Sequence, residues 1–410
     1  MNFNWKKVLW AVVRTLATGF ILGGILFIAI LFASLMGLAP YLQHVLWVLG
    51  GTVLLAAVLI SCGYLSTRAK HAVGIAVLCV ALCCAGYVGA GLYRDSIPTV
   101  DESSSRTTML WNYIPFDEEN KLAVLDHESS LQFESPYAVS LDGATALYPI
   151  YAAFTQAVYP EQWEDSGVEI DYSPYNSTVE CNGTIEAYNR LLKGEVQMIF
   201  AAGPSQAQLD AAYAAGKEFH MTPIGREAFV FFVNSKNPVT GLTVEQVQGI
   251  YSGSITNWKA VGGKNQKIRP FQRAEDSGSQ TALQRLMGDI PLMEPEEEDR
   301  IAGMGGIIRQ VANYRNYKNA LGFSFRFYST EMVQNGDIRL LTLNGIEPTR
   351  ETIRNDTYPI ASEFYAITCA PIGSPAPEET NPQIAAFLEW ILSKEGQALL
   401  EETGYVGLNP

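Results

Sequence analysis

The stretch IRPFQRAEDSGSQTALQRL, residues 268–286, decides the fold that this sequence predicts. Ile268 and Phe271 give it an apolar, β-prone start, and a run of small polar residues follows. Leu283 and Leu286 then recur at helical spacing. This order predicts a strand, a loop and the first turns of a helix, which is a repeating unit of α/β proteins.

The loop carries groups suited to a small anion. A helix start offers unpaired backbone N–H groups and a partial positive charge. The hydroxyls of Ser277, Ser279 and Thr281 add donors, and the forked guanidinium of Arg273 matches a tetrahedral oxyanion. The same residues also fit a simpler structure, a capped helix behind a strand with Arg273 paired to Glu275. This stretch alone leaves both interpretations open.

Charge divides the chain into two parts. Residues 1–93 hold five Lys or Arg and no Asp or Glu, which leaves 23 basic and 42 acidic residues in the rest of the 410. So acidic a body argues against nucleic acid as a partner. It still permits an anionic ligand, because local dipoles and one arginine outweigh distant, screened charges.

Three apolar runs, about 15–38, 45–65 and 72–93, are each long enough to cross a bilayer. They carry no acidic residue, which favours a membrane anchor over a transport pathway. Lys6 and Lys7 precede the first run, and Arg68 and Lys70 lie between the second and third. The positive-inside rule therefore places the N-terminus in the cytoplasm and everything after residue 93 outside. We expect residues 1–93 to form a multi-pass anchor in the cell membrane.

Beyond the anchor we expect an extracytoplasmic linker, 94–136, whose apolar part docks on a folded body. From 137 onward, strands alternate with helices, which predicts a mostly parallel sheet with ligand loops at the strands' carboxyl ends. The helix predicted near the C-terminus has no partner nearby in sequence. A chain that leaves one lobe, builds another and returns gives lobe 1 at about 137–230 and 362–410, and lobe 2 at about 231–361.

The predicted elements are short and regularly spaced. We expect strands at 137–141, 168–172, 196–201, 229–233, 320–327 and 364–368, and helices at 147–158, 184–192, 206–215, 244–251, 307–314 and 382–392.

Several motifs resemble those of a known family. DGATALYPIYAAF, REAFVFFVNSKNP, IYSGSITNWKAVGG, RAEDSGSQTAL and ILSKEGQALLEETGY are similar to segments of the phosphate-binding proteins of ABC uptake systems. The resemblance covers 137–410. It implies the two-lobed α/β fold of type II periplasmic-binding proteins, with a hinge and an inter-lobe cleft, here preceded by three transmembrane helices. It also implies phosphate or a related oxyanion as ligand, ABC permease subunits as partners, no cofactor and no enzymatic activity.

The resemblance also implies a set of ligand-binding residues on three loops. Gly203 stands where the family often has an acidic acceptor for protonated phosphate. Glu275 then either supplies that acceptor, which would discriminate phosphate from sulfate, or pairs with Arg273. The implied binding residues are Thr145, Ala146, Asn182, Gly183, Thr184, Arg273, Glu275, Ser277, Gly278 and Ser279.

Two other classes of function fit the sequence less well. A signalling receptor would pass lobe closure to a cytoplasmic partner, but the expected cytoplasmic segments are short. A hydrolase using Ser277 or Ser279 lacks a partner, because only His127 and His220 lie beyond the anchor and neither suggests a Ser–His pair. We expect no catalytic residue and no metal site. Cys181 and Cys369 are the cysteines outside the anchor, and whether they form a disulfide is left open.

Overall fold

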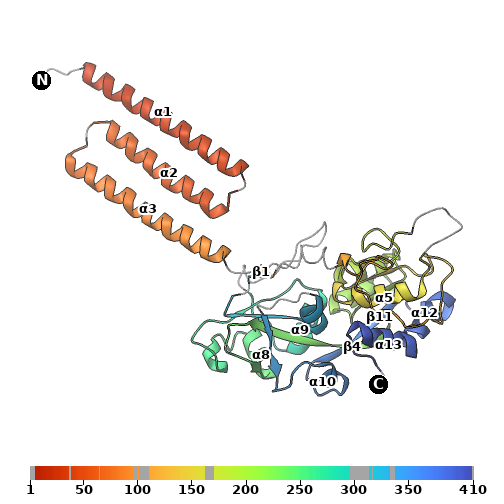
Figure 1. Ribbon diagram of the computed structural model, residues 1–410. Coiled ribbons are helices and arrows are strands. Elements are labelled where there is room, and N and C mark those ends of the chain that lie inside the picture. The colour runs from red at the N-terminus through yellow and green to blue at the C-terminus, as the bar shows by residue number, and fades with distance from the viewer. Residues whose placement is uncertain are drawn as a thin grey trace. The chain divides into compact units, whose positions relative to one another are not determined.

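The computed structural model describes residues 5–36, 38–63, 65–96, 99–100, 110–161, 170–295, 314–315, 317–332 and 338–408. It divides into two compact units, Met1–Pro98 and Thr99–Pro410 (Figure 1).

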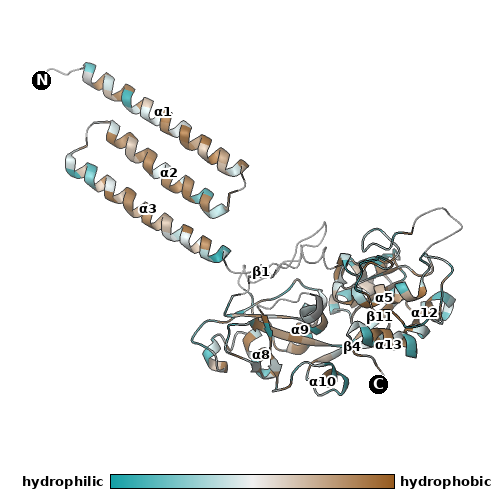
Figure 2. Ribbon diagram, viewed as in Figure 1, coloured by the Kyte–Doolittle hydropathy of each residue, from teal (hydrophilic) through white to brown (hydrophobic). Residues whose placement is uncertain are grey.

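The first unit is a set of three long helices, α1 (Trp5–Leu35), α2 (Pro40–Ser61) and α3 (Thr67–Asp95). Figure 2 shows them as mostly hydrophobic along their length. By length and composition, Val8–Leu35, Pro40–Ser61 and Thr67–Asp95 are each able to cross a membrane. Their large apolar side chains are largely exposed, with Phe20 at 86%, as expected of helices that face lipid.

Charged and polar groups sort to the two ends of this helical unit. The Arg14 guanidinium donates to the carbonyl of Ser61, where α2 ends and the chain turns toward α3. At the opposite end of α2, the hydroxyl of Tyr41 donates to the carboxylate of Asp95, 2.8 Å away. Arg14 thus lies at one end of the helices, and Asp95, with Arg94 beside it in the chain, lies at the other.

The second unit is organised on a seven-stranded mixed sheet. Its outer pairs, β2–β3 and β6–β8, are parallel, whereas β11 is antiparallel to both β3 and β4, and β4 is antiparallel to β8. The prediction of a mostly parallel sheet is wrong at its centre, because β4 carries the chain out of one lobe and β11 brings it back. The strand order is β2 (Leu141–Gly143), β3 (Met198–Ala202), β11 (Ala361–Pro371), β4 (Lys217–Asn234), β8 (Ala320–Phe325) and β6 (Arg269–Pro270), with β9 (Ile338–Leu340) also paired to β4.

Two small strand pairs and a set of helices complete the unit. β1 (Thr99–Val100) is antiparallel to β7 (Tyr314–Arg315), and β5 (Gly241–Leu242) is parallel to β10 (Thr342–Leu343). The helices are η1 (Thr145–Leu147), α5 (Tyr148–Val158), α6 (Thr184–Lys193), α7 (Gln206–Ala214), α8 (Val244–Tyr251), η2 (Trp258–Val261), α9 (Gly278–Met287), η4 (Tyr328–Met332), α10 (Arg350–Arg354), α11 (Pro377–Thr380), α12 (Pro382–Leu392) and α13 (Lys394–Thr403).

Each lobe has its own hydrophobic core. In lobe 1, Phe154 packs edge to face against Phe387 and Trp390, which joins α5 to the returning helix α12. Figure 1 shows α5, α12 and α13 in this lobe and α8 and α9 in the other. Along β4, Ile224 belongs to the first core and Ala228 to the second. The outgoing crossing therefore lies between them, a few residues before the predicted boundary at 230.

The apolar part of the predicted linker docks on lobe 1. Leu110 is fully buried, and Phe133 packs edge to face on Phe387. The backbone N–H of Phe116 donates to the side-chain carbonyl of Gln156 on α5 at 2.9 Å. The folded unit thus includes residues from 110 onward, which corrects the predicted start at 137.

Some predicted strands and helices, and the two cysteines beyond the anchor, can be compared with the structure one by one. The strand predicted at 137–141 is β2, which begins at Leu141, and residues 170–172 have no regular structure. The predicted helix 307–314 falls almost wholly outside the described residues, as do residues 168 and 169 of a predicted strand. Cys181 and Cys369 are both free thiols. Cys181 is buried in the core of lobe 1, and Cys369 packs beside a separate cluster.

Candidate ligand-binding site

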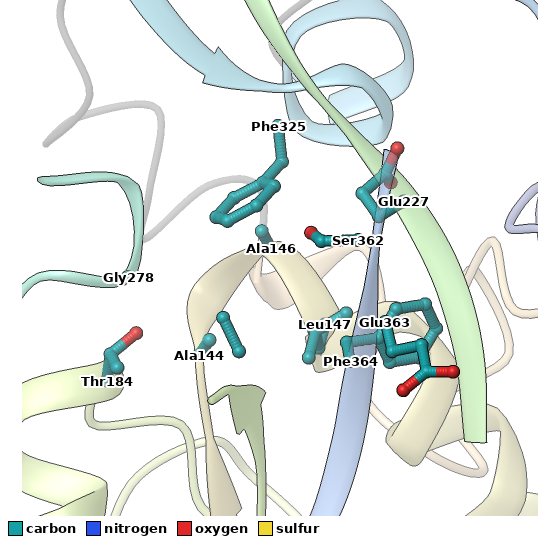
Figure 3. A pocket seen from close by; sticks show the side chains of 11 residues that line it. Ala144, Ala146, Leu147, Thr184, Glu227, Gly278, Phe325, Ser362, Glu363 and Phe364 are labelled. Atoms are coloured by element: carbon teal, nitrogen blue, oxygen red, sulfur yellow. The ribbon is translucent and has the colours of Figure 1, made fainter. Parts of the chain in front are cut away.

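A pocket opens where the two lobes meet beside the crossing strands. Its empty volume is about 380 Å³, which includes space open to solvent. Residues from lobe 1, lobe 2 and both crossing strands contribute to its wall (Figure 3). The lining residues are Ala144, Ala146, Leu147, Thr184, Ala202, Glu227, Gly278, Phe325, Ser362, Glu363 and Phe364.

Three helix N-termini converge on this pocket. Ala146 lies in the turn η1 that leads into α5, Thr184 is the first residue of α6, and Gly278 is the first residue of α9. The first turn of each helix leaves backbone N–H groups without intrahelical partners. Their partial positive charges favour an anion in this space, whereas the acidic side chains of Glu227 and Glu363 in the same lining oppose one.

Backbone hydrogen bonds hold the first loop against strand β3 and against the second loop. The N–H of Ala144 donates to the carbonyl of Phe200 on β3 at 2.8 Å, and the N–H of Gly183 donates to the carbonyl of Gly143 at 3.0 Å. Gly183 has a φ of 88°, a conformation that favours glycine. The sequence Gly183-Thr184 therefore turns sharply enough for α6 to start facing the pocket.

A buried ionic network lies behind these loops. Arg190 of α6 contacts Asp142 at 2.7 Å and Glu180 at 2.8 Å. Asn182 donates its backbone N–H to one oxygen of Asp142 and its side-chain amide to the other and to Glu180. Burial raises the pKa of the Asp142 carboxyl, and the hydrogen bonds from Asn182 and Gly143 and the charge of Arg190 oppose that rise. All N–H donors of Asn182 are thus used to hold the loop.

The third loop starts α9. Ser277 caps this helix by accepting from the N–H of Gln280, and the side chain of Gln280 in turn accepts from the N–H of Arg273 at 2.8 Å. Gly278 lies close to the opposite lobe. A Cβ at position 278 would stand 3.3 Å from the hydroxyl oxygen of Thr184, so a side chain there would narrow the pocket.

The predicted binding residues fall into four groups. Ala146, Thr184 and Gly278 line the pocket, and Thr145, Gly183, Ser277 and Ser279 are their immediate neighbours on the same loops. Arg273 and Glu275 are on the third loop but are not among the lining residues, and Glu275 is exposed. Asn182 holds the second loop from behind, as described above.

Sequence reasoning missed the contribution of the crossing strands. Ser362 of β11 and Glu227 of β4 are directly paired in register, and both line the pocket. Figure 3 shows the hydroxyl of Ser362 directed toward Ala146 and Phe325. Glu227 is 5% exposed and accepts from the N–H groups of Ala228 and Phe327. The sequence signal for this buried carboxylate was the position of Glu227, which directly precedes the apolar run AFVFFV.

The C-terminal segment supports the first loop. The hydroxyl of Tyr405 donates to the carbonyl of Ala146, and its ring stacks on Phe327 with 4.2 Å between centroids. Burial raises the pKa of Tyr405 well above its usual value, so it remains a neutral donor.

Within the part of the chain that the structure describes, no three His, Cys, Asp or Glu side chains lie close enough to hold a metal ion.

A two-lobed α/β unit with a cleft beside two crossing strands defines a solute-binding protein. A family model described as a PBP superfamily domain matches residues 123–395, which is more than half of the chain. The chain belongs to this superfamily of binding proteins, and its role is binding rather than catalysis.

Curated relatives match this chain over about two thirds of its length. The phosphate-binding protein PstS of Borreliella burgdorferi is 23% identical over 274 residues, covering 66% of this chain and 90% of the relative. Protein SphX of Synechococcus elongatus is 24% identical over 284 residues, covering 66% and 77%. The structure of an ABC-type phosphate transport receptor from Vibrio cholerae is 21% identical, covers 65% of this chain and 99% of its own, and has a TM-score of 0.43.

Proposed function

We propose that this protein captures phosphate, or a related oxyanion, in the pocket between its lobes. The observation that carries the proposal is the convergence of three helix N-termini, from both lobes, on one pocket. Such N-termini bind anions through backbone N–H groups and the helix dipole. The names of the curated relatives, phosphate-binding proteins in most cases, support phosphate as the ligand.

We assign roles to the loops accordingly. Thr145, Ala146, Gly183 and Thr184 supply donors from lobe 1, while Ser277, Gly278 and Ser279 supply them from lobe 2. Arg273, on the loop beside the pocket, supplies the compensating charge. Glu275 on the same loop either accepts a proton of the bound ion, which would favour phosphate over sulfate, or pairs with Arg273. Asn182 positions the second loop instead of donating to the ligand.

The same proposal extends to location and partners. The helices α1–α3 anchor the protein in the cell membrane, with the basic end, near Arg14, Arg68 and Lys70, at the cytoplasmic side. The binding unit then lies outside and delivers its ligand to ABC-type permease subunits. Purification from native membranes distinguishes uptake from sensing, because a co-purifying permease supports uptake and a co-purifying signalling kinase contradicts it.

A ligand panel tests the binding function. We expect phosphate to raise the melting temperature of the detergent-purified full chain, with smaller effects from sulfate, molybdate and methylphosphonate. Replacement of Arg273 by Ala should weaken phosphate binding by about 2–5 kcal/mol, because it leaves the buried anion without its compensating charge. If none of the four anions shifts the melting temperature, the proposed function is wrong.

A further inference from the structure

The two lobes contact each other directly at the start of α7. The hydroxyl of Ser205, at the start of α7 in lobe 1, donates to Asp276 Oδ1 of lobe 2 at 2.6 Å. The side-chain amide of Gln208 donates to the backbone carbonyl of Asp276 at 3.3 Å. Arg285 of α9 donates back to the carbonyl of Pro204 at 2.8 Å. These three hydrogen bonds form what we call the inter-lobe latch.

The lobe 1 side of the latch is preorganised. Ser205 is 5% exposed and caps α7 by accepting from the N–H of Gln208, whose side-chain carbonyl accepts in return from the N–H of Ser205. Because the cap uses a lone pair of the Ser205 hydroxyl, its proton is available for Asp276. A hydroxyl donating to a carboxylate at this distance is a charge-assisted bond, which is stronger than a neutral one.

The lobe 2 side is the third anion loop itself. Asp276 has a φ of 63°, in the left-handed region that non-glycine residues seldom adopt. It immediately precedes Ser277 and Gly278, which start α9 at the pocket. Contacts from the other lobe to both the side chain and the carbonyl of Asp276 therefore stabilise the backbone turn that aims the helix start at the ligand.

Gly203 leaves room for the third contact. A Cβ at position 203 would lie 3.1 Å from a guanidinium nitrogen of Arg285, which is tighter than nearly all Cβ contacts. The absence of a side chain at Gly203 thus allows Arg285 to reach the carbonyl of Pro204.

We propose that Ser205 and Gln208 are positioning residues that shape the anion loop across the lobe boundary, so that lobe closure and a complete anion site form together. The proposal rests on the proposed function for the identity of the ligand. It predicts that loss of the latch speeds release of the anion, because the loop relaxes and the lobes separate more readily.

Phosphate dissociation from the full chain in detergent tests this role. Ser205→Ala should raise the dissociation rate by about tenfold, the effect of removing one charge-assisted hydrogen bond. Ser205→Thr, which keeps a hydroxyl and the helix cap, should restore the wild-type rate. Ser393→Ala is the matched control, because Ser393 caps α13 through a hydrogen bond from the N–H of Gly396, which lies in the same lobe. Equal rates in Ser205→Ala and Ser393→Ala would overturn the proposal.

Amide hydrogen exchange separates this proposal from the identity of the ligand. Without added anion, Ser205→Ala should speed exchange in the peptide that covers 273–281, while Ser393→Ala should leave that peptide unchanged. Asp276→Gly should speed exchange in this peptide to a similar extent. The double variant Ser205→Ala/Asp276→Gly should exchange little faster than either single variant, because both changes remove the same hydrogen bond between Ser205 and Asp276. Unchanged exchange in both single variants would overturn the latch. Failure of wild type to bind phosphate would overturn the proposed function alone.

Discussion

Two polar side chains hold the first two loops of the pocket in place without lining it. Tyr405 donates to the carbonyl of Ala146, and Asn182 donates to Asp142 and Glu180. Groups that fix the backbone behind a binding site act on affinity through geometry, since a shift of the loop misaligns its N–H donors.

Removal of the Tyr405 hydroxyl tests the first of these supports. Tyr405→Phe removes the hydrogen bond to the part-buried carbonyl of Ala146 and should lower the free energy of unfolding by about 0.5–1.5 kcal/mol. Tyr159→Phe is the matched control, because Tyr159 donates to the carbonyl of Val139 in the same lobe at 2.7 Å. Urea denaturation should show similar losses for both variants, and only Tyr405→Phe should weaken anion binding. Equal anion affinity in the two variants would contradict this role.

The buried charges behind the second loop should be costly to separate. Asp142 is fully buried, so Arg190→Met leaves an uncompensated carboxylate in the core and should destabilise the unit by about 3–5 kcal/mol. Arg354, whose partner Glu401 is partly exposed, provides the comparison: Arg354→Met should cost at most about 1 kcal/mol. Chemical denaturation of both variants measures the difference, and similar losses would show that the network contributes little.

Local patterns predicted the helix starts but not the residues that face them. Gly183-Thr184 and Ser277-Gly278 carry small, capping residues that identify a helix N-terminus from sequence alone. Ser362 and Glu227 lie 135 positions apart and meet only because β11 pairs with β4. Ser205 and Asp276 meet only across the lobes. Contacts between distant segments leave no mark in a single sequence.

At the scale of elements, the segment 110–133 is fixed to lobe 1 by a cluster at the start of α13. Glu395 accepts from the N–H and hydroxyl of Ser130 and from the indole of Trp390. These hydrogen bonds lower the pKa of the Glu395 carboxyl from 4.5 to about 2, and the one from the Ser130 N–H contributes most. The ionised form of Glu395 is therefore the one that holds the segment.

This shift predicts an acid-dependent contribution to stability. A carboxyl whose pKa is lower in the folded state stabilises the protein above its unfolded pKa, and the contribution is lost as pH falls. The difference in unfolding free energy between wild type and Glu395→Gln should be largest above pH 4.5, the ordinary pKa of the carboxyl. It should shrink as the pH falls toward 2, the pKa in the folded protein. Thermal unfolding at a series of pH values checks this. A difference independent of pH would contradict it.

Helices were more predictable than the central strands. The bounds of α8 and α12 match the predicted 244–251 and 382–392, because each has strong apolar spacing and clear end signals. β4 runs from Lys217 to Asn234, although only 229–233 was predicted. Its first half contains Pro223 and Gly225, which disfavour a strand locally. Pairing with β11 overrides that preference, as tertiary contacts often do.

At the scale of the whole molecule, charge separates an acidic body from basic apolar helices, and we propose a membrane topology from it. In right-side-out membrane vesicles, an added protease should digest the unit 99–410. In inside-out vesicles the same unit should be protected. The reverse pattern would contradict the topology. Immunoblotting with an antibody to the C-terminal unit reads out both experiments.

The two-lobed architecture followed from a helix near the C-terminus with no local partner, and α12 indeed packs with α5 in lobe 1. The mixed direction of the sheet was not predictable in the same way. Which strands cross between lobes depends on chain reversal over more than 100 residues, and local spacing does not encode it.

Calorimetric titration of phosphate into the full chain and into Thr184→Val tests the central claim most directly. Valine keeps the shape of Thr184 but removes the hydroxyl that faces the pocket at the start of α6. We predict one phosphate per wild-type chain and binding about tenfold weaker, or more, in the variant, as expected for loss of one hydrogen bond to a charged ligand. Absence of binding to wild type, or equal affinity in both proteins, would contradict the anion site proposed between the lobes.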